Sequence, residues 1–128
     1  MQAFNVLRYE LTQHYDAHHD YFQESMYGPQ KSNRMATVLV YLDAPDEGGE
    51  TIFPLEGEKG EENIKGYTFK TCDRGYLFKP RAGDAVLFYS VDTTNTFDHQ
   101  SLHGGCPVQA GSKWVLTKWI RDRTHGGN

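Results

Sequence analysis

Apolar residues recur along this chain in short segments separated by polar, glycine-rich or proline-containing stretches. Residues 35–42 form the longest apolar run and are rich in β-formers, which is typical of a strand covered on both faces. Residues 113–121 form a second long predicted strand, with one face made of Lys113, Val115, Thr117, Trp119 and Arg121 and the other of Trp114, Leu116, Lys118 and Ile120. Further strands are predicted at residues 3–11, 15–22, 51–53, 76–79 and 85–90, around 103, and at 106–108. Many short strands punctuated by turns indicate an all-β sandwich or barrel.

Two polar segments are long enough to be loops. Residues 24–33 contain a Gly-Pro pair among mixed polar side chains. Residues 55–74 are charged and glycine-rich and have no apolar period. A loop of that length in a compact domain usually has a function or moves, so we expect it to cover a substrate groove as a lid. The strands fall within residues 1–121, which we expect to form one domain followed by a C-terminal tail at 122–128.

Composition narrows the classes of function. The chain has 128 residues and a net charge of −4, and no basic cluster stands out. It is therefore one domain at most, and we exclude nucleic acid as its main partner. No apolar run approaches the length of a membrane span. Cys72 and Cys106 either form one disulfide or remain free thiols, and they lack the paired Cys-x-x-Cys spacing of a zinc site.

The residues that carry chemistry gather in the second predicted strand. On an extended strand His18 and Asp20 lie two residues apart and point to the same side. One further imidazole from across the barrel would complete a face of two His and one carboxylate with open positions opposite, which is typical of non-haem Fe(II) oxygenases. His14 and Asp16 have the same spacing, so spacing alone does not choose between the two pairs.

Further motifs follow in order along the chain. They are Tyr9, Gly48-Gly49-Glu50-Thr51-x-Phe53-Pro54, Gly83-Asp84-Ala85-Val86-Leu87-Phe88, Ser101-Leu102-His103-Gly104-Gly105 and, ten residues after that His, Lys113. From about residue 4 to residue 121 the sequence resembles the catalytic domain of the prolyl 4-hydroxylases, within the Fe(II)/2-oxoglutarate dioxygenases. That family places its metal pair in a Tyr-x-x-His-x-Asp-Tyr/Phe frame, which selects His18 and Asp20 over His14 and Asp16. The resemblance implies a mainly β fold, the double-stranded β-helix or jelly roll, with the flanking helices largely absent from this chain.

The resemblance also implies the reaction and its central residues. His18, Asp20 and His103 would hold Fe(II), with 2-oxoglutarate as co-substrate and ascorbate as the expected reductant. The C5 carboxylate of 2-oxoglutarate lies deep in such a barrel and must meet a cation, and Lys113 matches the family position for it. The implied reaction hydroxylates C4 of peptidyl proline and gives 4-hydroxyproline, succinate and CO2.

Three more residues match positions around the co-substrate. Tyr9 and Thr51 have hydroxyls at family positions that hydrogen-bond 2-oxoglutarate. Trp119 shares a strand face with Lys113 and would wall the pocket. The alternative readings are a core aromatic for Tyr9, an ordinary turn residue for Thr51 and core packing for Trp119.

The partner implied by the resemblance is a proline-containing peptide or protein, docked as an extended polyproline II chain on aromatic faces. Tyr15 and Tyr21 would stack on proline rings, and Arg34 would bond a peptide carbonyl. Related hydroxylases often carry His where this chain has Arg121, so the substrate contact expected there departs from the family pattern. The resemblance points to the endoplasmic reticulum or secretory pathway as the compartment.

Other functions remain open beside this one. A dioxygenase with the same chemistry could act on another residue or on a small molecule. A jelly roll that binds proline-rich peptides without turnover would keep the fold, but it would have no chemical need for His18, Asp20, His103 and Lys113 together. A cupin-like metal protein without 2-oxoglutarate would leave Lys113 unused.

The last predicted strand also bears on what surrounds the domain. If Lys113 points into the barrel, then Trp114, Leu116 and Ile120 point outward. An apolar area of that size needs a cover. In the prolyl 4-hydroxylases helices that precede the core supply it, so we expect a truncated or minimal domain that lacks its N-terminal helices, or an oligomer.

Overall fold

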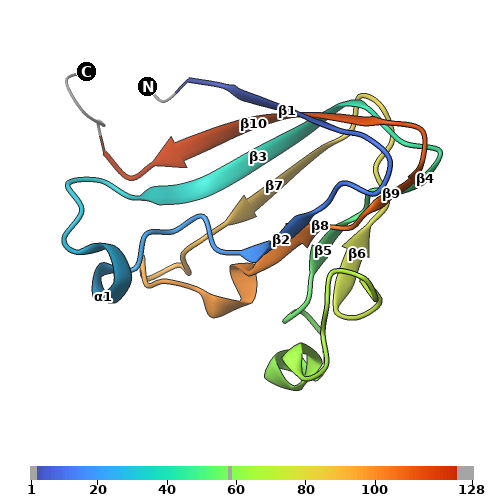
Figure 1. Ribbon diagram of the computed structural model, residues 1–128. Coiled ribbons are helices and arrows are strands. Elements are labelled where there is room, and N and C mark those ends of the chain that lie inside the picture. The colour runs from blue at the N-terminus through green and yellow to red at the C-terminus, as the bar shows by residue number, and fades with distance from the viewer. Residues whose placement is uncertain (1–2, 58, 124–128) are drawn as a thin grey trace.

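The computed structural model describes residues 3–57 and 59–123. Two four-stranded sheets face each other across the interior, and their strands pair antiparallel (Figure 1). The first sheet has the order β1-β10-β3-β7, built from β1 (Asn5–Tyr9), β10 (Lys113–Arg121), β3 (Arg34–Asp43) and β7 (Ala85–Tyr89). The second has the order β2-β8-β5-β6, built from β2 (Tyr15–His18), β8 (His103–Gly105), β5 (Thr51–Phe53) and β6 (Tyr76–Phe78). A short antiparallel pair, β4 (Glu47–Gly48) and β9 (Val108–Ala110), lies at one end of the two sheets. The predicted jelly-roll fold is confirmed.

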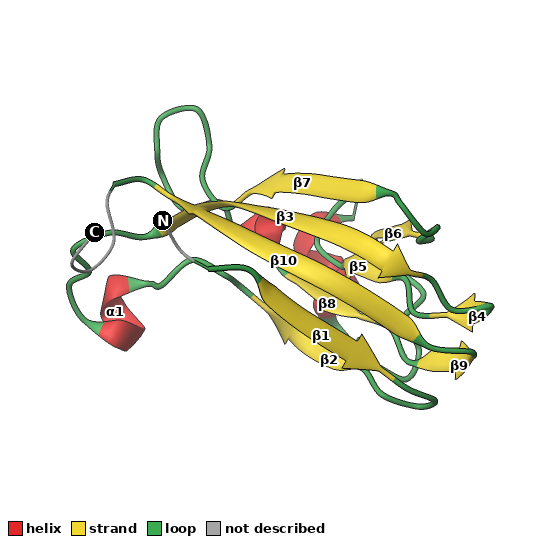
Figure 2. Cartoon of the chain, turned by 90° about the horizontal axis from the view of Figure 1, so that it is seen from above, coloured by secondary structure: helices red, strands yellow, loops and turns green. Residues whose placement is uncertain are grey.

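The alternation predicted for the last strand holds in the structure. Lys113, Val115 and Thr117 of β10 are buried, whereas Trp114 and Ile120 are exposed on the outer face. The prediction for the apolar run at residues 35–42 is only partly right, because the inner face of β3 is buried but Leu42 at its end is exposed. Within the described residues no helix covers the outer face of this sheet, which Figure 2 shows from above.

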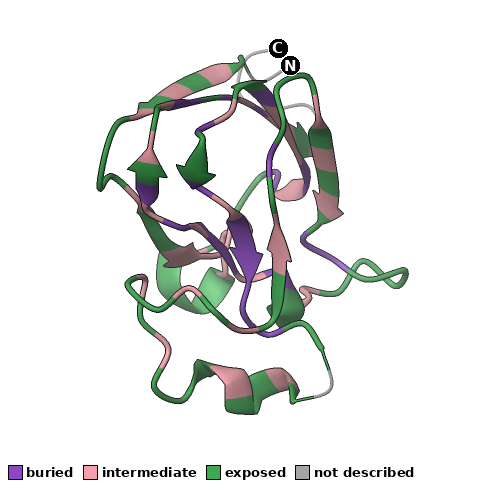
Figure 3. Cartoon of the chain, turned by 90° about the vertical axis from the view of Figure 1, so that its right-hand side faces the viewer, coloured by how far each residue is buried: buried purple, intermediate pink, exposed green. Residues whose placement is uncertain are grey.

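The core lies between the two sheets. Tyr41 from β3, Ile52 from β5 and Val108 from β9 are fully buried. Phe53 of β5 and Phe88 of β7 pack edge to face with ring centroids 5.2 Å apart, so this aromatic pair joins one sheet to the other. Figure 3 shows buried residues mainly on the strands, and exposed residues both on the strands and in the connecting segments.

Some element boundaries differ from the predicted ones. The strand predicted at residues 15–22 ends at His18, and the loop predicted at 24–33 contains a short helix, α1 (Glu24–Tyr27). The side chain of Asn33 holds the two ends of this segment together. It accepts a hydrogen bond from the backbone N–H of Phe22 and donates one to the backbone carbonyl of Phe22, both at 2.8 Å. These two bonds close residues 22–33 into a loop.

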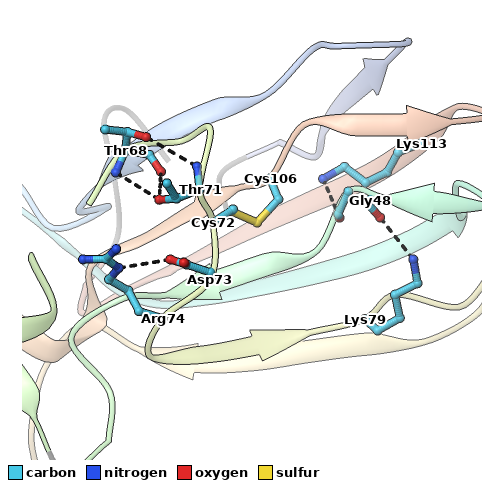
Figure 4. The surroundings of a disulfide bond; sticks show 10 residues. Gly48, Thr68, Thr71, Cys72, Asp73, Arg74, Lys79, Cys106 and Lys113 are labelled. Atoms are coloured by element: carbon cyan, nitrogen blue, oxygen red, sulfur yellow. Dashed lines mark hydrogen bonds and ion pairs between the residues drawn. A yellow bond between two sulfur atoms is a disulfide. The ribbon is translucent and has the colours of Figure 1, made fainter. Parts of the chain in front are cut away.

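The long loop at residues 55–74 contains a 3-10 helix, η1 (Gly60–Ile64), that lies away from the two sheets and is mostly exposed (Figure 3). A disulfide joins Cys72, near the end of this loop, to Cys106 just after β8 (Figure 4). Arg74 adds a hydrogen bond of 2.6 Å to the carbonyl of Lys65. The loop is thus fixed at its C-terminal end, and its function as a lid stays a prediction.

A second 3-10 helix, η2 (His99–Ser101), leads into β8. In the part of the chain that the structure describes, no helix is both long enough and apolar enough to cross a membrane. Of the tail predicted at 122–128, residues 124–128 lie outside the described residues.

Candidate active site

Two imidazoles and one carboxylate converge where the ends of β2 and β8 meet. His18 and His103 are cross-strand partners, and their ring centroids lie 4.5 Å apart. Oδ1 of Asp20 lies 3.3 Å from Nε2 of His18 and 3.5 Å from Nε2 of His103. One ligand atom from each of the three residues lies within 4.8 Å of the others. The expected proximity is therefore present, but Asp20 lies beyond the end of β2, so a shared strand face is not its cause.

Contacts behind the three residues orient their ligand atoms. The backbone carbonyls of Asp16 and Ser101 lie 2.8 Å from Nδ1 of His18 and His103, respectively. An Nδ1–H that donates to each carbonyl leaves the lone pair of Nε2 directed at the centre. The hydroxyl of Thr37 donates to Oδ2 of Asp20 at 2.6 Å and leaves Oδ1 facing the imidazoles.

The electrostatics favour the charged carboxylate of Asp20. Burial by itself raises the pKa of Asp20, but hydrogen bonds from His103, His18 and Thr37 outweigh it and hold the pKa well below its usual range. Burial acts to lower the pKa of His18, yet its bonds to Asp20 and to the Asp16 carbonyl leave it above the ordinary value. Asp20 is only 5% exposed, and a buried carboxylate needs positive charge nearby.

This donor set fits a divalent transition metal ion. Two imidazole nitrogens and one carboxylate oxygen are oriented by fixed acceptors and a donor, as metal ligands usually are. The other pair considered, His14 and Asp16, is not part of the cluster. Nε2 of His14 contacts Asp16 at 3.0 Å, and its ring stacks on Phe69 of the long loop with centroids 3.6 Å apart.

A cavity of about 430 Å³ extends from this cluster into the space between the sheets. Lys113 lines it and is 2% exposed, with its ammonium donating to the carbonyl of Gly49 at 3.1 Å. Burial lowers the pKa of Lys113 to about 8, against the opposing effect of Glu50. A buried ammonium facing a cavity suits an anionic ligand, since an unpaired buried charge is costly. A carboxylate fits this position.

Tyr9 and Thr51 line the same cavity. The ammonium of Lys113 lies over the ring of Tyr9, 4.4 Å from its centroid. Burial, reinforced by Tyr15 and Tyr41, raises the pKa of Tyr9 to about 12, so its hydroxyl stays protonated and can donate. The hydroxyl of Thr51 is hydrogen-bonded to that of Tyr41, which fixes it on the cavity wall.

Another part of the cavity lining is aromatic and cationic. Trp119 forms part of the wall, and its buried Nε1 has no hydrogen-bond partner within the described residues. The guanidinium of Arg34 lies over the Trp119 ring, 3.8 Å from the centroid. Tyr15 also lines the cavity and stacks on His18 at 4.3 Å.

Tyr21 and Arg121 do not line the cavity in the described structure. Tyr21 stacks on Phe97 with centroids 5.0 Å apart. Arg121 donates to the carbonyl and the hydroxyl of Ser32, both at 3.2 Å. The guanidinium of Arg121 lies 5.8 Å from the ring centroid of Phe22, which lines the cavity, but neither Arg121 nor Tyr21 lines it.

Several cavity residues were missed by sequence reasoning. Thr37 orients Asp20, and Phe22, Tyr27 and Leu39 line the cavity. Nothing in the sequence marks these residues, because their role depends on contacts between distant segments. Gly104 also lines the cavity, and the sequence marks it as part of a Gly-Gly pair directly after His103. A Cβ at Gly104 would lie 2.9 Å from the carbonyl of Tyr15 and would push β2 away from β8.

A jelly roll with a two-His, one-carboxylate cluster at one end of an internal cavity is the arrangement of non-haem Fe(II) oxygenases. Comparison with known families agrees, since residues 4–121 match the model of the 2OG-Fe(II) oxygenase superfamily. The chain belongs to this superfamily.

Named relatives point the same way. The chain is 54% identical over 122 residues to probable prolyl 4-hydroxylase 9 of Arabidopsis thaliana, covering 95% of this chain and 41% of that protein. It is 49% identical over 125 residues to prolyl 4-hydroxylase 13 of the same plant, covering 97% of this chain and 44% of that protein. The chain thus spans less than half the length of these curated relatives.

A solved structure shares the fold. The viral collagen prolyl hydroxylase of Paramecium Bursaria Chlorella virus-1, in its 2OG complex, matches with a TM-score of 0.68 and 30% sequence identity. The match covers 97% of this chain and 63% of the viral one. The resemblance to prolyl 4-hydroxylases inferred from the sequence motifs is confirmed.

Proposed function

We propose that this domain hydroxylates C4 of proline residues in a peptide or protein, using O2 and 2-oxoglutarate and giving 4-hydroxyproline, succinate and CO2. The observation that carries the proposal is the cavity that has the His18, Asp20 and His103 cluster at its wall and the buried ammonium of Lys113 facing the same space. Relatives named prolyl 4-hydroxylases support the substrate class.

In this proposal His18, Asp20 and His103 hold Fe(II). Bound there together with 2-oxoglutarate, Fe(II) would activate O2, the oxidant for an unactivated C–H bond that no side chain can oxidise. Thr37 and the two backbone carbonyls keep the ligand atoms aimed at the centre. Ascorbate is proposed as the reductant that keeps the iron in its ferrous state.

Lys113 and its neighbours would hold the far carboxylate of the co-substrate. The ammonium supplies the positive charge, and the hydroxyls of Tyr9 and Thr51 are placed in the same wall to hydrogen-bond. Trp119 closes the wall and keeps water away from the reacting end. These residues act on the co-substrate and would set its KM.

The peptide would enter by the aromatic and cationic part of the cavity. Tyr15 offers an exposed ring beside His18, suited to stack on proline, and Arg34 can donate to a peptide oxygen. Tyr21 and Arg121 would contact parts of the peptide outside the cavity. The catalytic unit is proposed to be residues 1–121, with residues 122–128 as a tail.

The outer face of the β1-β10-β3-β7 sheet is proposed to be covered in the working protein. Its relatives are more than twice as long as this chain, so helices outside this chain are the first candidate for the cover. A second copy of the chain is the other candidate for the cover.

The test is mass spectrometry of proline-containing peptides after incubation with Fe(II), ascorbate and 2-oxoglutarate. A gain of one oxygen on proline with matching succinate is the expected result. His103→Ala should abolish it, whereas the matched control His14→Ala should not. Full activity of His103→Ala would show that the metal is held elsewhere.

Two other outcomes would select the alternatives. Succinate formed without peptide modification, but stimulated by another substrate, would indicate a dioxygenase of the same chemistry with a different target. Peptide binding without turnover under any of these conditions would indicate a non-catalytic peptide-binding jelly roll.

A further inference from the structure

Two arginines pair across the first sheet, and one of them, Arg34, lines the cavity. Arg34 begins β3 and Arg121 ends β10, and they are register partners in the antiparallel sheet. Like charges directly opposite each other destabilise a sheet. Placing two guanidiniums at this pair of positions is therefore unfavourable for the fold, and local rules of this kind are broken mostly at functional sites.

Arg34 is held in place by aromatic rings alone. Its guanidinium lies 3.8 Å from the ring centroid of Trp119 and 4.7 Å from that of Phe22. Its Nε is buried without a partner, and no hydrogen bond or ion pair within the described residues involves the guanidinium. Stacking fixes the plane of the group and leaves its N–H edge available to a ligand in the cavity that it lines.

The nearby carboxylates are engaged elsewhere. Oδ1 of Asp20 faces His18 and His103, and its Oδ2 accepts from Thr37. Oδ1 of Asp122 accepts from the backbone N–H of Asn33 at 3.0 Å. Burial lowers the pKa of Arg34 and the like charge of Arg121 adds to this, while Asp20 acts in the opposite direction. The site therefore favours additional negative charge next to Arg34.

We propose that the peptide substrate carries an acidic side chain close to its target proline, and that Arg34 binds this carboxylate. The inference rests on the proposed function and deepens it. A peptide carbonyl would satisfy one N–H but leave the repulsion between the two guanidiniums unchanged. A carboxylate takes two N–H groups side by side and offsets that repulsion. Arg121, held by Ser32, adds positive potential behind the site rather than a direct contact.

The experiment compares proline peptides that differ at one position. A single Asp, Asn or Lys is placed in turn at each of about three positions on either side of the proline, a span set by the reach of neighbouring residues along an extended chain. At one of these positions Asp should lower the peptide KM about tenfold relative to Asn, since bonds to charged groups are worth that much. Lys at the same position should raise KM. The preference for Asp should shrink as salt is added.

Variants assign the effect to Arg34. Arg34→Gln should abolish the preference for Asp over Asn, while Arg34→Lys should retain part of it because the charge remains. The matched control is Arg81→Gln, which removes an exposed arginine outside the cavity and should leave the preference unchanged.

Failure of this inference differs from failure of the proposed function. Hydroxylation of Asp and Asn peptides with equal KM at every position would overturn the inference alone. If no peptide is hydroxylated, fluorescence anisotropy of labelled peptides still measures binding. Equal affinity for the Asp and Asn series would then overturn the acidic-substrate inference, whereas tighter binding of one Asp peptide would support it without turnover.

Discussion

Thr37 shows how a residue with no chemistry of its own can set the properties of the cluster. Its hydroxyl donates to Oδ2 of Asp20 at 2.6 Å, and the residue is 1% exposed. It lies on the inner face of β3, opposite Trp119 of β10 and Phe88 of β7. The centre of the first sheet thus fixes the carboxylate that follows the end of β2.

We predict that Thr37→Val weakens metal binding about tenfold, as loss of an orienting partner usually does. The substitution keeps the shape but removes the donor, so Asp20 can rotate and loses a stabilising bond. Titration with Co(II), followed by its absorption spectrum, measures the affinity without relying on turnover. Thr37→Ser keeps the hydroxyl and should bind nearly as well as the wild type. Equal affinities for all three proteins would show that the bond is incidental.

Lys113 makes co-substrate binding depend on pH. Burial lowers its pKa to about 8, so below that pH the ammonium is charged and ready for a carboxylate. As the pH rises through 8, the free protein loses the proton that the bound carboxylate requires. The dissociation constant for 2-oxoglutarate should therefore rise, by about tenfold per pH unit above pH 8.

Calorimetric titration of the Mn(II)-loaded protein between pH 7 and about 9.5 would test this dependence, a range that spans the lowered pKa but not the ordinary one. Lys113→Arg is the informative control, because guanidinium stays charged throughout. Its affinity should be independent of pH, whatever its absolute value. A wild-type constant that is flat across the range would contradict the role of Lys113.

At the scale of residues, sequence reasoning found those whose chemistry is rare and missed those whose role is positional. His18, Asp20, His103 and Lys113 could be selected because imidazole, carboxylate and ammonium at these spacings have few other uses together. Thr37 and Phe22 could not, since a threonine in an apolar strand and a phenylalanine near a loop occur in any β protein. Asp20 lies beside His18 as predicted, but a shared strand face is not the cause, because the strand ends before it.

At the scale of elements, long patterned strands were predictable and short elements were not. Once the family position of Lys113 sets which face of residues 113–121 points inward, the period of two predicts that Val115 and Thr117 are buried and that Trp114 and Ile120 are exposed, as they are. The four-residue helix α1 has no period to detect, and its segment bends because of the side chain of Asn33, which bonds Phe22 eleven residues away in the chain. The pairing of Cys72 with Cys106 was left open, because two cysteines define no framework.

The disulfide between Cys72 and Cys106 anchors the long loop to the segment that follows β8. It closes a span of 34 residues that contains β6 and β7. Such a cross-link reduces the entropy of the unfolded chain, so the double variant Cys72→Ser with Cys106→Ser should lose about 2–4 kcal/mol of unfolding free energy. Urea unfolding with and without dithiothreitol measures this loss.

Dithiothreitol supplies the control for the unfolding experiment. It should destabilise the wild type to the level of the double variant and leave the variant itself unchanged. Wild-type stability that does not respond to complete reduction, verified by thiol titration, would contradict the assignment of stability to the bond.

At the scale of the whole molecule, the outer face of the first sheet carries an apolar row that crosses all four strands, with Arg8 and Lys118 as charged residues beside it. One row runs across all four strands through Val6, Leu116, Val40 and Ala85, which are register neighbours. Leu87 and Tyr89 on β7 are 53% and 56% exposed. Exposed apolar patches of this kind mark contact sites.

We predict that this chain by itself associates through that face. Sedimentation velocity at micromolar concentrations should show species larger than a monomer, and the dye ANS should bind. Leu87→Glu together with Ile120→Lys should shift the protein towards monomer, because charges on the face oppose its burial. Ile64→Glu is the matched control, since Ile64 is an exposed apolar residue of η1 in the long loop and its change should leave association unaltered.

The form of the association distinguishes the two proposed covers. A single dimeric species whose affinity falls in the double variant favours a second copy of the chain, because a self-complementary patch closes on itself. A concentration-dependent series of larger species favours helices from outside this chain, because an uncovered face then pairs without a fixed geometry. A monodisperse monomer that does not bind ANS would mean that the exposed face needs no cover, and the proposal of a covering element would be wrong.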